Sequence, residues 1–216
     1  MSLSAGAIPW VPDPESLFVS KPSSHAVVRN AEPADAAAIA AIGMVSVPET
    51  YKDLCEEAVV YSIVEQSYAL DALRACIARC ARADDAHFLV AESAGRIVGF
   101  LHYDCEGPEP ELHRIYLDSA EKRKGIGSTL VGELPARLDV GAGYILMVIA
   151  ANHPAVAFYR RHGLVDEANV DGPTYMHEQM GVDFPPGTAP VPALVLRFTK
   201  TFGSSRRGAC APGADG

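Results

Sequence analysis

The chain has 216 residues, 49% hydrophobic and 21% charged, and its 18 Lys and Arg against 27 Asp and Glu give a net charge of −9. This composition fits one globular domain with extensions and excludes the disordered and fibrous classes. Because a uniformly acidic chain repels a phosphate backbone and attracts cations, we expect no nucleic-acid partner and favour cationic partners such as amines.

Three further classes are excluded by sequence pattern: membrane proteins, secreted proteins and metal-finger proteins. No apolar run approaches the ~18 residues needed to cross a bilayer, so we expect no membrane partner. Residues 1–10 lack the charged segment, apolar stretch and cleavage site of a secretory signal. The five cysteines are odd in number and include no Cys-x-x-Cys pair. These features predict a cytoplasmic protein with reduced thiols, no disulfide framework and no metal site.

The two ends of the chain differ in composition from the middle. Four prolines within residues 1–24 predict an extended arm, since they interrupt helices and central strands. The small and polar residues of 203–216 predict a disordered tail. We therefore expect one folded domain over residues 25–202.

The first half of this domain alternates between strand and helix patterns. Residues 26–30 predict a short strand, and the alanine-rich residues 32–44 predict a helix. Residues 46–82 predict one or two further helices. Residues 87–92 and 96–103 are apolar runs around a short Ser-Ala-Gly turn, which predicts a β-hairpin.

The next elements surround a glycine-containing loop. Residues 112–117 predict a strand before the loop, and a helix follows it up to about Val140. Pro135 falls inside this helix and predicts that the helix is divided into two pieces, because an interior proline removes a hydrogen bond.

The last third continues the same alternation. The fully apolar residues 144–149 predict a central strand, and residues 154–162 predict a helix that stops at Gly163. Residues 164–167 and 193–199 predict the last two strands. Strands interleaved with helices indicate an α/β or α+β domain with a mixed sheet.

The connection over residues 168–192 is unusually long. Its length of about twenty-five residues far exceeds the usual ~4–6 for a connection. Long ordered loops of this kind serve as lids, binding loops or interface arms.

The loop between the strand at 112–117 and its helix has the character of an anion site. Its sequence is Lys122, Arg123, Lys124, Gly125, Ile126, Gly127 and Ser128. Glycines let the backbone turn and approach a ligand closely, and the N–H groups at a helix start attract anions. Three cations beside those groups indicate phosphate, although a solvated basic turn would have the same sequence. The loop is neither a P-loop nor a dinucleotide fingerprint.

A second segment opens the helix after the apolar strand. It contains Asn152, Pro154, Phe158, Tyr159 and Gly163. Taken alone, Asn152 is explained by a helix cap and the two aromatic residues by core packing.

Together and in this order, the two segments resemble the GNAT superfamily of acyl-CoA N-acyltransferases. The family carries Gln/Arg-x-x-Gly-x-Gly/Ala after its fourth strand, where this chain has Lys122, Gly125 and Gly127. It also carries Asn-x-x-Ala-x-x-Phe-Tyr before a Gly-Leu strand. Asn152, Ala155, Phe158, Tyr159, Gly163 and Leu164 match that pattern.

The resemblance implies a fold and a cofactor. The fold is a mixed, mostly antiparallel sheet of about seven strands with helices on both faces and with strands 4 and 5 splayed apart. The cofactor is acetyl-CoA, with its pyrophosphate on the loop amides and its pantetheine along the edge of the fourth strand. The cofactor-binding residues implied are Ile115, Tyr116, Leu117, Lys122, Arg123, Lys124, Gly125, Ile126, Gly127, Ser128, Asn152 and Phe158.

The resemblance also implies an activity, the direct transfer of acetyl to a primary amine of a small molecule, peptide or protein. Tyr159 matches the family's proton donor to the leaving thiolate. Glu111 matches the base of the histone-acetylating branch, and His113 could share its face unless a bulge changes the alternation. Another branch places a glutamate where this chain has Met147. The remaining candidates for the base are His102, Asp104 and Glu106.

Two other functions and the acceptor stay open. A module that binds acyl-CoA without turnover would carry the same motifs, and a nucleotide- or phosphate-binding enzyme rests on the loop glycines alone. Dimerisation is common in the family, and the arm and the long connection are candidate contacts. Residues 46–68 and 168–192 are expected to shape the acceptor pocket. The aromatic groups considered for its lining are Tyr51, Tyr61, Tyr68, Tyr175 and His177.

Overall fold

The structure is a computed structural model that describes residues 26–105, 109–138 and 142–200. The predicted arm at 1–24 and the predicted tail at 203–216 lie outside these residues. Within the described part of the chain, no helix is both long enough and apolar enough to cross a membrane.

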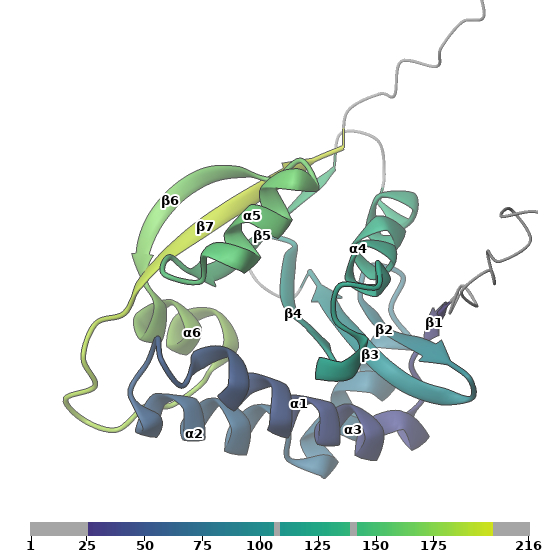
Figure 1. The fold of residues 1–216 in the computed structure, drawn as a ribbon, viewed down its shortest axis with the longest axis horizontal. Coiled ribbons are helices and arrows are strands. Elements are labelled where there is room, and N and C mark those ends of the chain that lie inside the picture. The colour runs from purple at the N-terminus through teal and green to yellow at the C-terminus, as the bar shows by residue number, and fades with distance from the viewer. Residues whose placement is uncertain (1–25, 106–108, 139–141, 201–216) are drawn as a thin grey trace, which may run out of the picture.

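A seven-stranded mixed sheet forms the centre of the described fold (Figure 1). Its strand order is β1-β2-β3-β4-β5-β7-β6, and all neighbours are antiparallel except β4 and β5. This confirms the predicted fold class. The strands are β1 (Val27–Asn30), β2 (His87–Ser93), β3 (Arg96–Asp104), β4 (Glu111–Leu117), β5 (Gly143–Ile149), β6 (Val165–Asp171) and β7 (Pro192–Thr199).

Helices cover both faces of this sheet. The helices α1, α2 and α3 lie together on one face, whereas α4 and α5 lie on the other (Figure 1). The α-helices are α1 (Ala36–Tyr51), α2 (Glu57–Ser67), α3 (Leu70–Cys80), α4 (Ile126–Arg137), α5 (His153–Arg161) and α6 (Gly172–Met180), with short 3₁₀ turns at Pro33–Asp35 and Ser119–Glu121.

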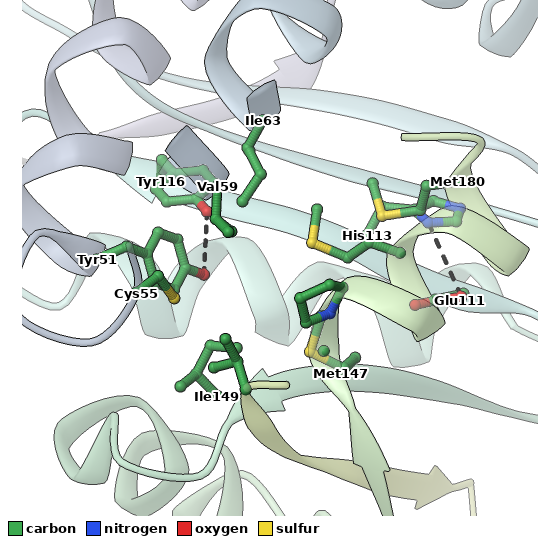
Figure 2. Close-up of a pocket in the computed structure, with 14 residues that line it drawn as sticks. Tyr51, Cys55, Val59, Ile63, Glu111, His113, Tyr116, Met147, Ile149 and Met180 are labelled. Atoms are coloured by element: carbon green, nitrogen blue, oxygen red, sulfur yellow. Dashed lines mark hydrogen bonds and ion pairs between the residues drawn. The ribbon is translucent and has the colours of Figure 1, made fainter. Parts of the chain in front are cut away.

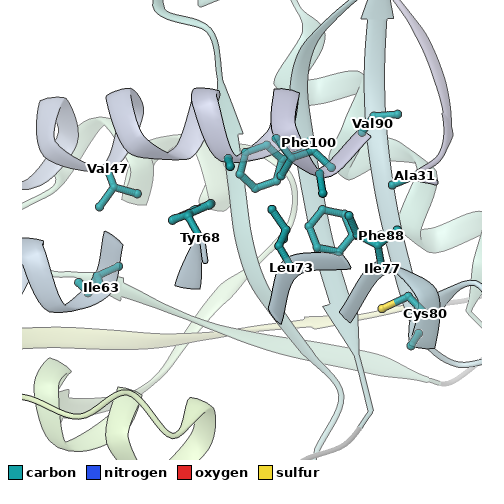
Figure 3. Close-up of a cluster of buried hydrophobic side chains, with 14 of the residues drawn as sticks. Ala31, Val47, Ile63, Tyr68, Leu73, Ile77, Cys80, Phe88, Val90 and Phe100 are labelled. Atoms are coloured by element: carbon teal, nitrogen blue, oxygen red, sulfur yellow. The ribbon is translucent and has the colours of Figure 1, made fainter. Parts of the chain in front are cut away.

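Alternation along β2 and β3 supplies both cores. Phe88 and Phe100 point towards α1 and α3, where they pack with Tyr68, Leu73 and other buried residues (Figure 3). Their neighbours Leu89 and Leu101 belong to the second core, beneath α4. Since side chains alternate between the faces of a strand, two apolar runs serve two hydrophobic layers.

The predicted hairpin is present, and its turn follows from two residues. Ala94 has φ of 50° and Gly95 has φ of 73°. Two successive residues with positive φ are the requirement of a tight hairpin turn that matches the twist of the strands.

Three predictions about individual elements were wrong. Pro135 does not divide its helix, because it lies in the last turn of α4, where the missing N–H leaves the rest of the helix intact. The alanine-rich helix does not stop at Met44 but continues through Pro48 to Tyr51. The connection at 168–192 is not one loop, since β6 extends to Asp171 and α6 follows it directly.

The strands β4 and β5 separate as the resemblance implied. Their register contains a single pair, Glu111 with Ile145. The Ile145 N–H also donates to the Pro110 carbonyl at 2.9 Å, which joins the strands at one end. Beyond this point the two strands diverge, and the gap between them becomes the site described next.

Candidate functional site

A groove opens where β4 and β5 part. It has a volume of about 300 Å³ and is bordered by the end of α1, β4, β5, the loop before α4 and the start of α5. The lining includes Ile115, Tyr116, Leu117, Lys122, Gly127, Asn152, Phe158 and Tyr159, all of which the sequence had singled out. Residues of five separate segments are thus brought to one cavity.

The edge of β4 is paired on one side only. Ile115 and Tyr116 pair with Leu101 and Phe100 of β3, and neither has a partner in the register with β5. Leu117 differs, since its carbonyl accepts a hydrogen bond from Ser46 at 2.8 Å. Backbone groups directed towards β5 therefore face the groove and are suited to pair with an extended ligand.

The basic loop turns into α4 through two residues in the left-handed region. Arg123 has φ of 63°, and Gly125, the residue that precedes the helix, has φ of 88°. The first N–H groups of a helix lack intrahelical acceptors, and the helix dipole adds positive potential there. The start of α4 therefore has N–H groups of the kind that bind anions, and the anion site stays a prediction.

The lysines of this loop occupy different positions. Lys122 lines the groove and lies 3.7 Å from a carboxylate oxygen of Glu49. Lys124 instead donates to Glu121 at 3.0 Å. Only Lys122 of these two lines the groove, so it is the lysine placed to contact a ligand there.

The helix α5 begins at the groove and positions three of its residues. Asn152 is its N-cap and accepts a hydrogen bond from the Ala155 N–H at 3.3 Å, so the structural explanation of Asn152 holds. Phe158 packs close to Gly127, and Tyr159 follows it on the groove wall. Burial raises the pKa of Tyr159, which keeps its hydroxyl protonated and able to donate.

A second cavity, of about 50 Å³, adjoins the groove (Figure 2). The two cavities share Tyr51, His113, Tyr116 and Met147. Helices α1, α2 and α6 and the strand β5 supply most of its wall. The apolar lining consists of Cys55, Val59, Ile63, Met147, Ile149, Pro173, Met176, Met180 and Val191.

Polar groups lie at two ends of this second cavity. The Tyr116 hydroxyl donates to the Tyr51 hydroxyl at 3.3 Å on one side (Figure 2). Glu111 and His113 lie on the other side, with 3.9 Å between the Glu111 carboxylate and His113 Nδ1. Glu111 is only 5% exposed, and burial raises the pKa of its carboxyl group. A buried carboxyl with a raised pKa is a stronger base than an exposed one.

Asp104 contacts the other ring nitrogen of His113, and it also contacts His102. His113 Nε2 lies 2.9 Å from Asp104 Oδ1, and His102 Nε2 lies 3.2 Å from Asp104 Oδ2. Burial opposes ionisation of Asp104, but its contacts with the two histidines prevail and lower its pKa. An ionised Asp104 fixes the orientation of His113 beside Glu111.

A β-bulge explains how His113 reaches this position. Asp104 pairs with Glu111 and Tyr103 with Leu112, but His102 pairs with Arg114, so His113 has no partner in the register. His113 contacts Asp104, and Arg114 contacts His102, on the same face of the sheet. The bulge thus changes the alternation. Glu111 and His113 nevertheless both line the second cavity.

Comparison with known proteins begins with a family model. Residues 84–165 match the model of the acetyltransferase (GNAT) domain, and this span contains the loop, the β4 edge and all of α5. This segment of the chain is similar to the GNAT acetyltransferase domain. The match supports the expectation of an acetyltransferase that uses acetyl-CoA. No match was found among curated proteins.

Solved structures share the GNAT fold at low sequence identity. PaiA N-acetyltransferase of Thermoplasma acidophilum, solved with coenzyme A, has a TM-score of 0.62 and 21% identity over 82% of this chain and 99% of that one. Ribosomal-protein-alanine N-acetyltransferase of Brucella melitensis has a TM-score of 0.59 and 22% identity over 80% and 99%. These likenesses concern the fold, since the identity is low.

The remaining sequence candidates are distributed unevenly around the two cavities. Tyr51 lines both cavities, and Tyr175 interacts with Glu111 from α6. Tyr68 is buried in the core at 5% exposure, and Tyr61 is 64% exposed, so neither lines a cavity of the site. His177 also points elsewhere and contacts Asp183 at 3.3 Å.

Glu106, a candidate base, lies outside the described residues. The apolar wall of the second cavity was not found from sequence, apart from the expectation that residues 46–68 and 168–192 would shape it. Isolated Val, Ile and Met residues in those segments give no signal that distinguishes a ligand cavity from a core.

Proposed function

We propose that the protein transfers the acetyl group of acetyl-CoA to a primary amine whose apolar arm occupies the second cavity. The observation that carries this proposal is the junction of the two cavities at Tyr51, His113, Tyr116 and Met147. A groove suited to an extended acyl carrier and a smaller apolar pocket therefore meet beside a buried carboxylate.

The groove residues fit acetyl-CoA in two respects. The loop from Arg123 to Ser128 offers helix N-terminal donors for a pyrophosphate, and Lys122 adds a positive charge on the groove wall. The one-sided edge at Ile115 and Tyr116 offers backbone groups for a pantetheine arm. When bound, acetyl-CoA supplies an activated thioester. A backbone N–H of this edge can stabilise developing negative charge on the carbonyl oxygen.

Glu111 is the proposed general base. An ammonium group is not nucleophilic, so a base must remove a proton from the amine. Glu111 is buried at one polar end of the second cavity, and its raised pKa makes it a stronger base there. His113, held by Asp104, lies between Glu111 and the groove and is placed to orient the amine.

Tyr159 is the proposed acid. The coenzyme leaves as a thiolate, and a thiol with an ordinary pKa near ~8.5 is a moderate leaving group. Tyr159 lines the groove, and burial keeps its hydroxyl protonated at neutral pH. It can therefore donate a proton as the carbon–sulfur bond breaks.

The second cavity indicates the class of amine. Its wall is apolar, and its acidic group lies at one end, which suits a primary amine carried on a short apolar arm. The net charge of −9 attracts such cations over a distance. The four described cysteines are free thiols, which supports the cytoplasm as the proposed location.

The proposal is tested by an acceptor screen with acetyl-CoA. The full-length protein is incubated with alkylamines, arylalkylamines, polyamines, amino acids and peptides. Thiol release and product mass are both recorded. We expect acetylated product with arylalkylamines or alkylamines ahead of polyamines. Stabilisation by acetyl-CoA without any product across the panel would favour the sensor function instead.

A further inference from the structure

Two cysteines and a histidine meet outside the acyl-transfer site. Cys76 and Cys80 lie one turn apart on α3, and His102 lies on β3 beneath them. Their ligand atoms, two sulfurs and a ring nitrogen, all lie within 4.8 Å of one another. Cys80 and His102 are buried and Cys76 is partly buried. Figure 3 shows Cys80 at the end of the core, beside Ile77.

The spacing of these cysteines suits a shared ligand better than a disulfide. Residues four apart on a helix have Cβ atoms ~5–6 Å apart. A disulfide requires ~3.5–4.5 Å between the Cβ atoms, so it would distort α3. Side chains one helical turn apart are, by contrast, a common arrangement for two ligands of one metal ion.

Electron-rich atoms converge on one nitrogen of His102. Cys76 Sγ lies 3.5 Å from His102 Nε2, and Asp104 Oδ2 lies 3.2 Å from the same nitrogen. A single ring N–H cannot serve both partners well, whereas a cation among them would attract all of them.

Two arginines adjoin the cluster and bear on its charge. Arg79 contacts Asp104 at 3.3 Å and Cys76 at 3.8 Å, and Arg114 lies 3.5 Å from His102 Nδ1. Metal binding at Nε2 places the ring proton on Nδ1, so the Nη2 group of Arg114 must turn away. The hydrogen bond of Arg114 Nη1 to the Ser67 carbonyl at 2.7 Å does not depend on that contact.

We propose that Cys76, Cys80 and His102 bind a Zn²⁺ ion that ties α3 to β3. Two thiolates and an imidazole are a donor set that zinc prefers, and a water molecule can complete a tetrahedral site. Cys76 also lines a surface cavity of about 150 Å³, which gives an entry path for the ion. The sequence did not reveal this site, because its third ligand lies twenty-two residues after Cys80, without a second closely spaced pair.

The test is metal binding by the full-length protein, reduced and freed of metal by a chelator. Co²⁺ is titrated first, as a spectroscopic probe, and Zn²⁺ is then added in competition. We expect one equivalent of Co²⁺ with a thiolate charge-transfer band and tetrahedral visible bands, both removed by Zn²⁺. Zn²⁺ should also raise the thermal unfolding midpoint.

Single-residue variants test which side chains bind the ion. Cys76→Ser and Cys80→Ser should each weaken Zn²⁺ affinity by more than about 100-fold, because loss of a direct ligand exceeds the ~10–100-fold effect of an outer group. His102→Gln should weaken Zn²⁺ affinity to a similar degree, although it removes no thiol. Cys105→Ser is the matched control, since this free thiol instead contacts Tyr103 and the Asp85 carbonyl.

The outcome is independent of acetyl transfer, because no acyl donor or amine enters the assay. Absence of the thiolate band in the wild-type chain would overturn the proposal. Equal loss of affinity in Cys105→Ser would do the same. Circular dichroism of each metal-free variant shows whether it folds. If a cysteine variant does not fold, His102→Gln and the wild-type stoichiometry decide the question.

Discussion

The two halves of the site are built in different ways. The groove depends mainly on segments that are close in the sequence, which are β4, the loop, β5 and the start of α5, all within residues 112–159; only the end of α1 joins them from a distance. The second cavity draws most of its wall from α1, α2, β5, α6 and the residue before β7, which span residues 51–191. A ligand held by backbone groups requires a few glycines and caps at fixed spacing, whereas a side-chain pocket requires only apolar residues that happen to meet.

This difference indicates which substitutions can change the specificity for the amine. Substitutions in the apolar cavity alter which amine fits while the groove keeps its shape. Substitutions in the groove should affect every acceptor equally.

Tyr159→Phe removes the proposed acid while keeping the ring. We expect kcat to fall by ~10³ with every amine, within the range for a positioned acid or base. Acetyl-CoA affinity, measured by calorimetry, should change little. Tyr61→Phe on the exposed face of α2 is the control. An unchanged kcat at every pH would remove Tyr159 from the reaction.

Glu111→Gln removes the proposed base at the polar end of the cavity. We expect kcat/KM to fall by ~10². A base must be ionised, so wild-type activity should be lost as pH falls through a pKa that burial has raised above the ordinary 4.5. The variant should lack that part of the acid limb in a pH–rate profile.

The matched control for this variant is Glu57→Gln, at an exposed carboxylate in the first turn of α2. It should keep both the rate and the acid limb. If Glu111→Gln kept the wild-type profile as well, another group would be the base.

Gly125→Ala strains the turn that aims the loop amides. Its φ of 88° places an added Cβ in the left-handed region, at a cost of roughly 1–2 kcal/mol. We expect acetyl-CoA affinity to fall by about tenfold.

Gly187→Ala carries the same strain, at φ of 85°, away from the groove. Both glycines have open space where a Cβ would lie, so neither substitution causes a steric clash. The effect of each variant therefore comes from backbone strain alone. Both variants should lose similar stability in chemical denaturation, but only Gly125→Ala should bind acetyl-CoA more weakly. Equal affinities would contradict the proposed cradle.

A series of primary amines with longer apolar arms gives the smallest effect. Each buried methylene contributes ~0.8 kcal/mol, so kcat/KM should rise by roughly fourfold per carbon until the cavity is filled. Met176→Ala removes side-chain volume from the wall of the second cavity. The enlarged cavity should shift the arm length with the highest kcat/KM to a longer arm. A flat series in both proteins would show that the arm lies elsewhere.

The sequence alone determined the parts that depend on local backbone geometry. The glycines of the loop, the cap at Asn152 and the alternation of β2 and β3 are short-range patterns with one main structural solution. The resemblance that the loop and the Asn152 segment carry implied the arrangement of the sheet and the groove residues. Pro135 was misjudged because its effect depends on where the helix ends, which is set by packing.

Only the tertiary structure decided what lies across from these segments. The bulge at His113, the helix α6 within the long connection, and the apolar wall from Cys55 to Val191 come from contacts between distant segments. The meeting of Cys76, Cys80 and His102 has the same origin. Such contacts are fixed by how helices pack on the sheet, because burial of apolar area is non-directional and leaves no spacing in the sequence to read.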